Sequence, residues 1–567
     1  MTALVKKVKG GRAYWYATDS ARVNGQPRVV RQRYLGTVES IEAAFDAAFD
    51  PGSIDVVEFG ATAAMWALAG RINFGLWVDA LLGSQATGLS VGTYLQAAAV
   101  NRAVKPRSKR GFITYYDRSV LARLVPAPPQ AWASQRFWDA MDLVDVSLVE
   151  RIEEAYVKSA MDEFGIDAKA LVYDATNFHT YISSTNGKAP VAQRGHAKNK
   201  RFDLRLVGLA LACSTDHRIP LAHISTAGND PDSKVFASSL PRLLSRLEAV
   251  GVDPASVTVV FDKGNNSEAN LKAVNVAAIG FVGSLVPTQH QDLLGVPDEE
   301  YQDVEDLPGV VAYRATKRIY GVARTIVVTR SESFLAKQLV GLAQTRGRVE
   351  VALAELVRLL AGGRHKMDRQ KLETRVKEAL APRWMRRLYR TEITGEARDD
   401  LALSWSFDEE AFEQLKATEL GKRIIFTDRD AWSTRQIVVA YRSQWEVEAA
   451  FRQMKSHEHA AFRPIHHWTD QKIRVHALYG VASLMLVNLA WREADKVGMG
   501  LSPNEVMEAL AAIQEVTLIY PPAKGQGKPR ILRKLTTMDS AQRDLFELFG
   551  LDAFAPREGT TAKWSGI

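Results

Sequence analysis

The sequence predicts an α/β protein with a mixed central sheet that begins near residue 170. Three apolar runs of strand length follow one another there, ALVYD, LRLVGLALAC and IPLAHIST. A helical pattern, a strand (SVTVVFD), a second helical pattern (SEANLKAVNVAA) and a last strand (IGFVGSLV) come next. Three consecutive strands followed by alternating helices and strands describe a ribonuclease H-like sheet.

Composition restricts the class of protein and its compartment. The 567 residues are too many for one compact core, and 46% hydrophobic with 24% charged residues is typical of a globular protein. The formal net charge of +8 moderately favours polyanionic partners. A single cysteine, Cys213, excludes an intramolecular disulfide and a cysteine-based zinc site and fits a reducing compartment. The N-terminus lacks the pattern of a signal peptide, so we expect a cytoplasmic protein.

The pattern along the chain predicts six segments. They are a small β unit (1–52), a helical, DNA-binding region (53–165), the first part of the ribonuclease H-like core (166–290), a mixed α/β insertion domain (291–425), the second part of the core with a catalytic helix (426–500) and a C-terminal tail region (501–567).

Particular stretches support these segments. The β unit alternates on both sides of a turn at Asn24-Gly25, and the insertion opens with a hairpin, VVAYRATKRIYGVARTIVVT. The longest apolar run, His476 to Trp491, is shorter than the ~20 residues of a membrane span, so we expect a buried core helix and no membrane partner. The basic, Pro/Gly-rich stretch YPPAKGQGKPRILRKL predicts a flexible surface segment.

A polar stripe marks the helix expected from Ser433 to Lys455. Tyr441, Glu448 and Lys455 are spaced seven residues apart, which at ~100° per residue places them within about 40° of one another. Gln444 and Arg452 lie beside them, whereas Glu446 points ~160° away from Glu448. Such a stripe can also be an ordinary solvated helix face, and spacing alone leaves both interpretations open.

Two aspartates follow predicted strands. Asp174 ends the first, in LVYDATNF, and Asp262 ends the fourth, in VTVVFDKGNNSEAN, at the sheet edge where open α/β sheets bind ligands. Strand-terminal aspartates also start turns and cap helices. Three carboxylates, Asp174, Asp262 and Glu448, repel one another unless cations bind them. Two Mg²⁺ or Mn²⁺ ions about 4 Å apart would suit oxygen ligands and phosphoryl transfer, with Lys455 and Tyr441 reaching substrate phosphates.

A cluster of basic residues lies in the predicted helical region. In AVKPRSKRGFITYYDRS, four cations precede Tyr115 and Tyr116: Lys105, Arg107, Lys109 and Arg110. Basic residues interleaved with aromatic ones suit a nucleic-acid backbone, and a solvated basic loop is an equal alternative.

The motif around Glu448 resembles that of the DDE transposases of insertion-sequence family 4, particularly the 1634-like branch. That motif is tyrosine, two residues, arginine, three residues, glutamate, six residues, lysine, and this chain has Tyr441, Gln444, Glu448 and Lys455 at the same spacing. LVYDATNF and VVFDKGNNSEAN resemble the two aspartate blocks of the family.

This resemblance implies a bacterial transposase whose Asp174, Asp262 and Glu448 hold two Mg²⁺ or Mn²⁺ ions. It further implies binding of double-stranded DNA (transposon ends and target), Mg-dependent cleavage and strand transfer, a homodimer assembled on DNA, and a nucleoid-associated location. Gln444 departs from the motif because it offers phosphate a neutral contact where the family has arginine. Arg452 is the better candidate to replace that arginine.

Other functions remain open. The same scaffold suits a DNA-binding protein that does not transpose, or a metal-dependent nuclease. A tyrosine recombinase is disfavoured, because its chemistry needs arginines and a histidine around the nucleophile and no acidic triad.

Overall fold

The computed structural model describes residues 2–23, 26–49, 51–83, 88–195, 201–362, 367–397, 400–521 and 529–557. The chain divides into two compact units. The first unit contains Met1–Glu163, Tyr181–Ala189 and Arg452–Ile567, and the second contains Phe164–Thr180 and Pro190–Phe451.

The second unit is built on a nine-stranded sheet with the order β10-β11-β12-β15-β9-β8-β5-β6-β7. Its strands are β5 (Ala170–His179), β6 (Leu206–Ser214), β7 (Pro220–Ala227), β8 (Thr258–Val260), β9 (Gly280–Ser284), β10 (Gln302–Asp303), β11 (Val310–Ile319), β12 (Val322–Ser331) and β15 (Lys422–Thr427). Every residue of β6 is buried, as its continuous apolar sequence predicts for a strand covered on both faces.

The predicted run of three strands followed by alternating helices and strands is confirmed. The β5–β6 and β6–β7 pairs are antiparallel, whereas β8 pairs in parallel with both β5 and β9. Helix α9 (Asp232–Ala249) precedes β8, and α10 (Glu268–Val276) precedes β9. The short helix α11 (Gln291–Leu294) comes after β9.

The region expected to be an insertion domain (291–425) is partly built into the same sheet. The predicted hairpin is present as β11 and β12, but β12 pairs with β15, which in turn pairs with β9. Apolar side chains of these strands, such as Val327 and Ile425, are buried at 0% and 1% exposure, so the sheet extends through them. The separate part is therefore only the segment between β12 and β15.

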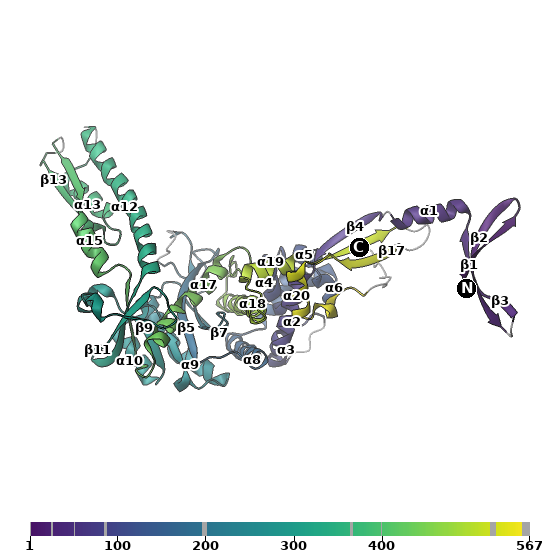
Figure 1. Cartoon of the computed structure of the whole chain (residues 1–567), viewed down its shortest axis with the longest axis horizontal. Helices are drawn as coiled ribbons and strands as arrows, with labels where there is room; N and C mark the ends of the chain where they lie inside the picture. The colour runs from purple at the N-terminus through teal and green to yellow at the C-terminus, as the bar shows by residue number, and fades with distance from the viewer. Residues whose placement is uncertain are drawn as a thin grey trace. The chain divides into compact units, whose positions relative to one another are not determined.

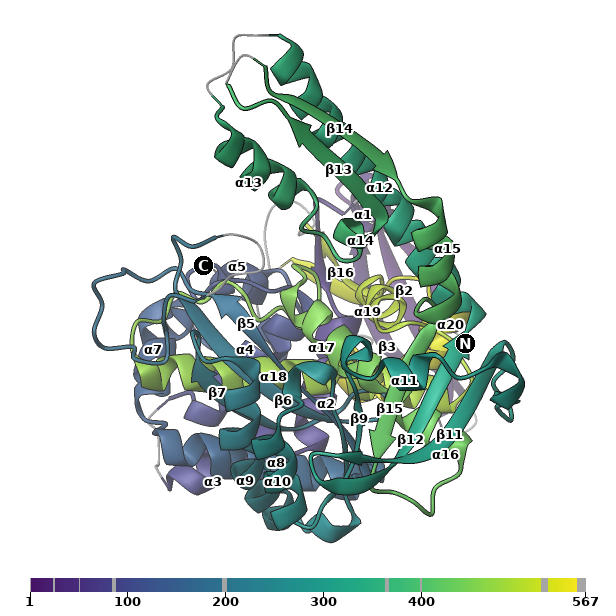
Figure 2. The same cartoon turned by 90° about the vertical axis from the view of Figure 1, so that its left-hand side faces the viewer.

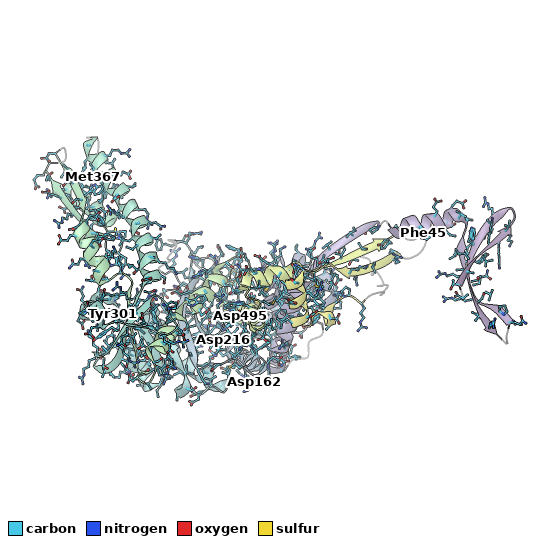
Figure 3. All side chains as sticks on the ribbon, viewed as in Figure 1. Phe45, Asp162, Asp216, Tyr301, Met367 and Asp495 are labelled. Atoms are coloured by element: carbon cyan, nitrogen blue, oxygen red, sulfur yellow. The ribbon has the colours of Figure 1, made fainter. Side chains whose placement is uncertain are left out.

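That segment has its own hydrophobic core. It consists of α12 (Glu332–Ala361), α13 (Arg369–Ala379), α14 (Met385–Leu388), β13 (Tyr389–Thr394), β14 (Ala402–Phe407) and α15 (Glu409–Thr418), grouped together in Figure 2. Leu353, Leu372 and Leu415 are fully buried in this core, and Met367, labelled in Figure 3, belongs to it. The stretch LALSWSF contains β14, which pairs antiparallel with β13.

The first unit contains a helical core. Its helices are α2 (Gly60–Arg71), α3 (Phe74–Leu82), α4 (Val91–Val104), α5 (Phe112–Asp117), α6 (Leu121–Leu124), α7 (Ser134–Asp142), α8 (Val146–Phe164), α18 (Asp470–Lys496), α19 (Pro503–Ala511) and α20 (Ser540–Leu548). Helix α18 is long and apolar enough to cross a membrane by length and composition, but nearly all of its apolar part is buried inside the protein. The predicted core helix is thus confirmed.

Two further sheets belong to the first unit. In the first, β1 (Thr2–Lys9), β2 (Arg12–Val23) and β3 (Gln26–Gly36) form the predicted N-terminal β unit (Figure 1), followed by α1 (Val38–Phe49); the predicted turn at Asn24-Gly25 lies outside the described residues. In the second sheet, β16 (Gln514–Tyr520) lies between β4 (Ser53–Glu58) and β17 (Arg530–Leu535).

This second sheet corrects two expectations. Residues 53–58 were assigned to a helical region but form strand β4, because β16 supplies a partner from the other end of the chain. The basic stretch from Tyr520 was predicted to be a flexible surface segment, yet Arg530–Leu535 is a paired strand. Residues 522–528 of that stretch lie outside the described residues.

Glu58, at the end of β4, gives the first unit a pH-dependent stability. Its carboxylate accepts hydrogen bonds from the backbone N–H groups of Ala61 (2.7 Å) and Thr62 (3.2 Å) at the start of α2. Burial nevertheless raises the pKa of Glu58 from 4.5 to about 7. A raised folded-state pKa means that the folded protein binds this proton more tightly, so the contribution of Glu58 to stability falls as pH rises from about 4.5 to about 7.

We expect Glu58→Gln to remove this dependence. An amide oxygen can still accept the helix N–H groups, and no charge has to be buried at high pH. At pH 8 the variant should be more stable by roughly 2 kcal/mol, a value reduced from the full shift because Glu58 is partly exposed. Thermal unfolding at several pH values between 5 and 8 measures this. Parallel curves for the variant and the wild type would contradict the assignment.

Candidate functional site

Asp174 lies in β5, and Asp262 lies two residues beyond the end of the neighbouring parallel strand β8, at the same level of the sheet. In the β5–β8 pair, Val172 is opposite Val260, and each aspartate follows two residues later in its chain. The backbone at Asp262 is still extended, with φ −84° and ψ 165°. Because side chains alternate along a strand, both carboxylates share one face of the sheet, on backbones about 4.8 Å apart. The register therefore brings these two predicted residues together.

The position of Asp174 within its strand differs from the prediction. Strand β5 continues to His179, so Asp174 lies in its middle and not at its end. The longer strand exists because residues up to His179 pair with β6, Asp174 itself lying opposite Leu211. Asp262 was predicted to end the fourth strand, but β8 ends at Val260, so Asp262 lies two residues beyond the strand.

Two hydroxyl groups hold the Asp262 carboxylate. Ser284 Oγ, at the end of β9, donates to Asp262 Oδ1 at 3.2 Å, and the Tyr441 hydroxyl donates to the same oxygen at 3.4 Å. Tyr441 is only 5% exposed, and burial raises its pKa, so its hydroxyl keeps the proton that it donates. Ser284 was not predicted; its only signal in the sequence is a polar residue in the apolar run IGFVGSLV.

Helix formation stops briefly between Tyr441 and Glu448. Residues 434–455 form two helices, α16 (Thr434–Arg442) and α17 (Gln444–Lys455), with Ser443 between them. The angular argument from the sequence therefore does not extend across Ser443 to Tyr441. It holds within α17, where Glu448, Arg452 and Lys455 follow one another at intervals of four and three residues and share a helix face. Glu448 and Arg452 are exposed, and Lys455 is half-buried.

Glu446 and Glu448 have different environments. Glu446 is 8% exposed, and its Oε2 lies 4.0 Å from Nη1 of Arg218 in the turn between β6 and β7. Burial raises the pKa of Glu446, and Arg218 opposes that shift. Glu448, in contrast, is exposed. The structure thus gives Glu446 an ion-pair partner and leaves Glu448 on the surface, and the catalytic role of Glu448 stays a prediction.

The three predicted carboxylates, Asp174, Asp262 and Glu448, do not form a complete metal site in this structure. In the ranges that the structure describes, no three Asp, Glu, His or Cys side chains come close enough to hold a metal ion. The oxygen-only donors of Asp174 and Asp262 fit a hard divalent cation, and their shared level suits one ion between them. Glu448 would have to approach them to complete a triad.

The side chains of Gln444 and Tyr441, both predicted to contact DNA, are buried. Gln444 is 6% exposed at the start of α17, and its side-chain oxygen lacks a hydrogen-bond partner among the described residues. The Tyr441 hydroxyl is engaged with Asp262. The burial of both residues against the sheet explains why the polar stripe predicted from spacing is incomplete. A phosphate contact by Arg452 or Lys455 stays a prediction.

The basic cluster of the first unit also differs from its sequence pattern. Lys105, Arg107 and Arg110 are exposed, whereas Lys109 is half-buried with its Nζ 4.1 Å from the ring centroid of Tyr479. Burial, and secondarily Arg102, lowers the pKa of Lys109.

The two tyrosines after this cluster belong to the core. Tyr115 and Tyr116 are each 4% exposed. The Tyr115 hydroxyl lies 2.8 Å from Thr62 Oγ1, and the Tyr116 hydroxyl donates to the carbonyl of Val125. The interleaved basic and aromatic residues therefore do not form one continuous surface, and stacking of bases on these tyrosines is not supported.

Tyr441→Phe separates two roles for the tyrosine. If the hydroxyl positions Asp262, we expect the variant to lower the rate of metal-dependent DNA cleavage about tenfold, in line with one lost hydrogen bond to a charged group. DNA affinity should stay unchanged. A phosphate contact would give the opposite pattern, with weaker DNA binding. Cleavage rates at saturating DNA, compared with equilibrium binding in EDTA, distinguish the two outcomes.

Comparison with known proteins gives one informative match. No curated protein matches the sequence. A solved structure, a piggyBac transposase synaptic complex with hairpin DNA, is 9% identical, with a TM-score of 0.36 over 80% of this chain and 78% of that chain. A structural similarity this low supports no inference about this chain. The family model described as "Transposase DDE domain" matches residues 166–381, a region that includes Asp174 and Asp262 and ends before Tyr441 and Glu448. That match supports a DDE transposase.

Proposed function

We propose that this chain is the transposase of a bacterial insertion sequence, of family 4 and its 1634-like branch, which binds the ends of its element and catalyses Mg-dependent DNA cleavage and strand transfer. The observation that carries the proposal is the pair Asp174, in β5, and Asp262, just beyond the adjacent parallel strand β8, at one level of the sheet inside the region that matches a transposase DDE domain.

The sheet supports the same proposal. In the strand order β7-β6-β5-β8-β9, β6 is antiparallel to both of its neighbours whereas β5, β8 and β9 are parallel, a pattern that supports the proposed ribonuclease H-like sheet. In that arrangement acidic residues at the centre of the sheet serve metal-dependent cleavage of nucleic acids. The proposal places the protein in the bacterial cytoplasm, associated with the nucleoid, and as a homodimer when it is assembled on DNA.

Each residue has a defined task in this reaction. Asp174, Asp262 and Glu448 would hold two Mg²⁺ or Mn²⁺ ions, which supply activation of the attacking oxygen and stabilisation of the leaving oxygen. Ser284 and Tyr441 keep the Asp262 carboxylate oriented through their hydrogen bonds. Arg452 and Lys455, on the face of α17 that carries Glu448, would bind DNA phosphates near the reacting bond.

Two reactions follow in order. Water attacks the phosphorus at the end of the element and the 3′-oxygen leaves with a proton, which gives a free 3′-hydroxyl. That hydroxyl then attacks a phosphodiester of the target DNA and displaces its 3′-oxygen in turn. No covalent bond between protein and DNA forms.

The test uses the full-length protein and the DNA that flanks its coding region. With Mg²⁺ or Mn²⁺ we expect cleavage at terminal inverted repeats and joining of the freed ends to a target plasmid, and no reaction in EDTA. Cleavage without joining and without end specificity would indicate a metal-dependent nuclease on the same scaffold. Specific binding without cleavage would indicate a DNA-binding protein that does not transpose. A protein-DNA adduct would exclude the proposed chemistry.

A further inference from the structure

The N-terminal sheet carries nearly all of the net charge of the chain. Among residues 1–36 there are eight cations and one carboxylate, Asp19, so this segment contributes +7 of the total of +8. The cations are Lys6, Lys7, Lys9, Arg12, Arg22, Arg28, Arg31 and Arg33. The remaining 531 residues are almost neutral overall. This concentration of charge is a property of one small sheet and not of the protein as a whole.

Three arginines line one face of that sheet. On the central strand β2, Ala17 is paired with Arg33, Asp19 with Arg31 and Ala21 with Arg28. Paired residues point to the same face, and a register shift after Asp19 keeps Arg28 on the face of Arg31 and Arg33.

Lys6 of β1 is paired with Trp15, on the same face as the arginines. All three arginines and Lys6 are exposed, whereas Ala17 and Ala21 beside them are small. We call this surface, formed by Lys6, Arg28, Arg31 and Arg33, the arginine face.

The opposite face also carries cations, Lys7, Lys9, Arg12 and Arg22, but it differs from the arginine face, which contains Asp19, in its aromatic side chains. It carries Tyr14, Tyr16 and Tyr34, with 5.2 Å between the ring centroids of Tyr16 and Tyr34, and the Nζ of Lys7 lies 4.9 Å from the ring centroid of Tyr16. The aromatic side chains on this face contact one another. The two faces of the sheet therefore offer chemically distinct surfaces.

The sheet is also largely uncovered. Thr18 and Gly36 are its only buried residues in the part of β1–β3 whose burial is described, and Leu4 and Val8 are each 66% exposed. Three strands with so little burial gain little stability from a core of their own. A surface with this exposure and charge is typical of one that binds a partner.

We propose that the arginine face binds the sugar-phosphate backbone of duplex DNA. The surplus of cations matches a polyanion, and small β-sheets and ribbons are of a size to enter or span a DNA groove. A second copy of the chain would bring like charges together on this sheet. Single-stranded DNA would favour the tyrosine face, where bases can stack. The proposal deepens the proposed function by naming a DNA-binding surface, and it requires neither metal ions nor catalysis.

The test measures duplex binding by the full-length protein in EDTA, by fluorescence anisotropy over a series of salt concentrations. The variant Arg28→Ala/Arg31→Ala/Arg33→Ala should bind at least tenfold more weakly, and the slope of log K against log[salt] should fall by about 2 to 3. The matched control, Lys7→Ala/Lys9→Ala/Arg12→Ala, removes the same charge from the same sheet on the tyrosine face. It should retain most of the affinity and slope.

Further variants and measurements test whether a loss of charge or of folding explains weaker DNA binding. Replacing the three arginines by lysine keeps the charge and should restore most of the binding if the contacts are to phosphates. Circular dichroism and thermal unfolding check that each variant folds. Equal losses in the arginine variant and its control, or no loss in either, would overturn the proposal. A preference for single strands that depends on Tyr14, Tyr16 and Tyr34 would also overturn it, as would an arginine-dependent dimer without DNA.

These results are separable from those on catalysis. Arginine-dependent duplex binding by a protein that never cleaves DNA would sustain this inference and overturn the proposed function. Metal-dependent cleavage and joining with unchanged binding in the arginine variant would do the reverse.

Discussion

Asp174→Asn and Asp262→Asn are each expected to reduce metal-dependent DNA cleavage by at least about 10³-fold, equivalent to roughly 4 kcal/mol of transition-state stabilisation. Asparagine preserves the size and most of the hydrogen bonding of aspartate but removes the charge that holds a divalent cation. The shared level of Asp174 in β5 and Asp262 just beyond β8 makes the losses alike, because each carboxylate would serve the same ions. Gel assays of cleavage in Mg²⁺ and Mn²⁺ measure the effect.

Asp253→Asn is the matched control for this experiment. Asp253 is an exposed aspartate of the same unit that begins a short helical turn by accepting a hydrogen bond from the N–H of Ala255. Asparagine serves equally well at that position, so cleavage should equal that of the wild type. DNA affinity in EDTA should be unchanged in all three variants. Full activity in Asp174→Asn or Asp262→Asn would exclude that residue from the metal site.

The strands of the central sheet could be predicted because they are short, continuous apolar runs. Burial on both faces leaves such a pattern, as in LVGLALACS of β6, whose residues are all buried. The end of β5 could not be predicted, because Asp174 to His179 are held in the strand by pairing with β6 and not by their own composition. Strand β4 was missed for the same reason, since its partner β16 lies more than 450 residues further along the chain.

The candidate site could also be predicted only in part, because some of its features depend on contacts between distant parts of the chain. Spacing in the sequence selected Tyr441, Glu448 and Lys455, whereas Asp262 was selected as the end of a predicted strand. The spacing argument assumed one continuous helix, and nothing in the sequence marks the interruption at Ser443. Nor could spacing show that Tyr441 and Gln444 are buried, because burial depends on which part of the sheet the helices cover. The hydrogen bond from Tyr441 to Asp262 joins residues 179 positions apart and is visible only in the folded chain.

Glu448→Gln and Glu446→Gln are expected to have different effects on cleavage, although the residues are two positions apart. Glu448 is exposed, so Glu448→Gln should leave the unfolding temperature unchanged while cleavage falls by at least about 10²-fold, the loss of one metal-binding charge. Glu446 is almost buried beside Arg218, so Glu446→Gln removes one partner of a buried ion pair. Burial raises the pKa of Glu446 although Arg218 opposes that shift, so the fold disfavours the charged carboxylate. We therefore expect Glu446→Gln to keep or slightly raise the stability at pH 7, with cleavage near that of the wild type.

This pair of variants also tests whether α17 moves. In the proposed mechanism Glu448 approaches the two aspartates when the ions and DNA bind, since no three metal-binding side chains of the described residues lie together. Hydrogen exchange in the backbone of α17 should then slow when Mg²⁺ and DNA are both present, and Glu448→Gln should abolish this protection while Glu446→Gln retains it. If Glu446→Gln abolishes cleavage and Glu448→Gln does not, the third carboxylate is Glu446. In that case the ion pair with Arg218 would have to open before an ion could bind.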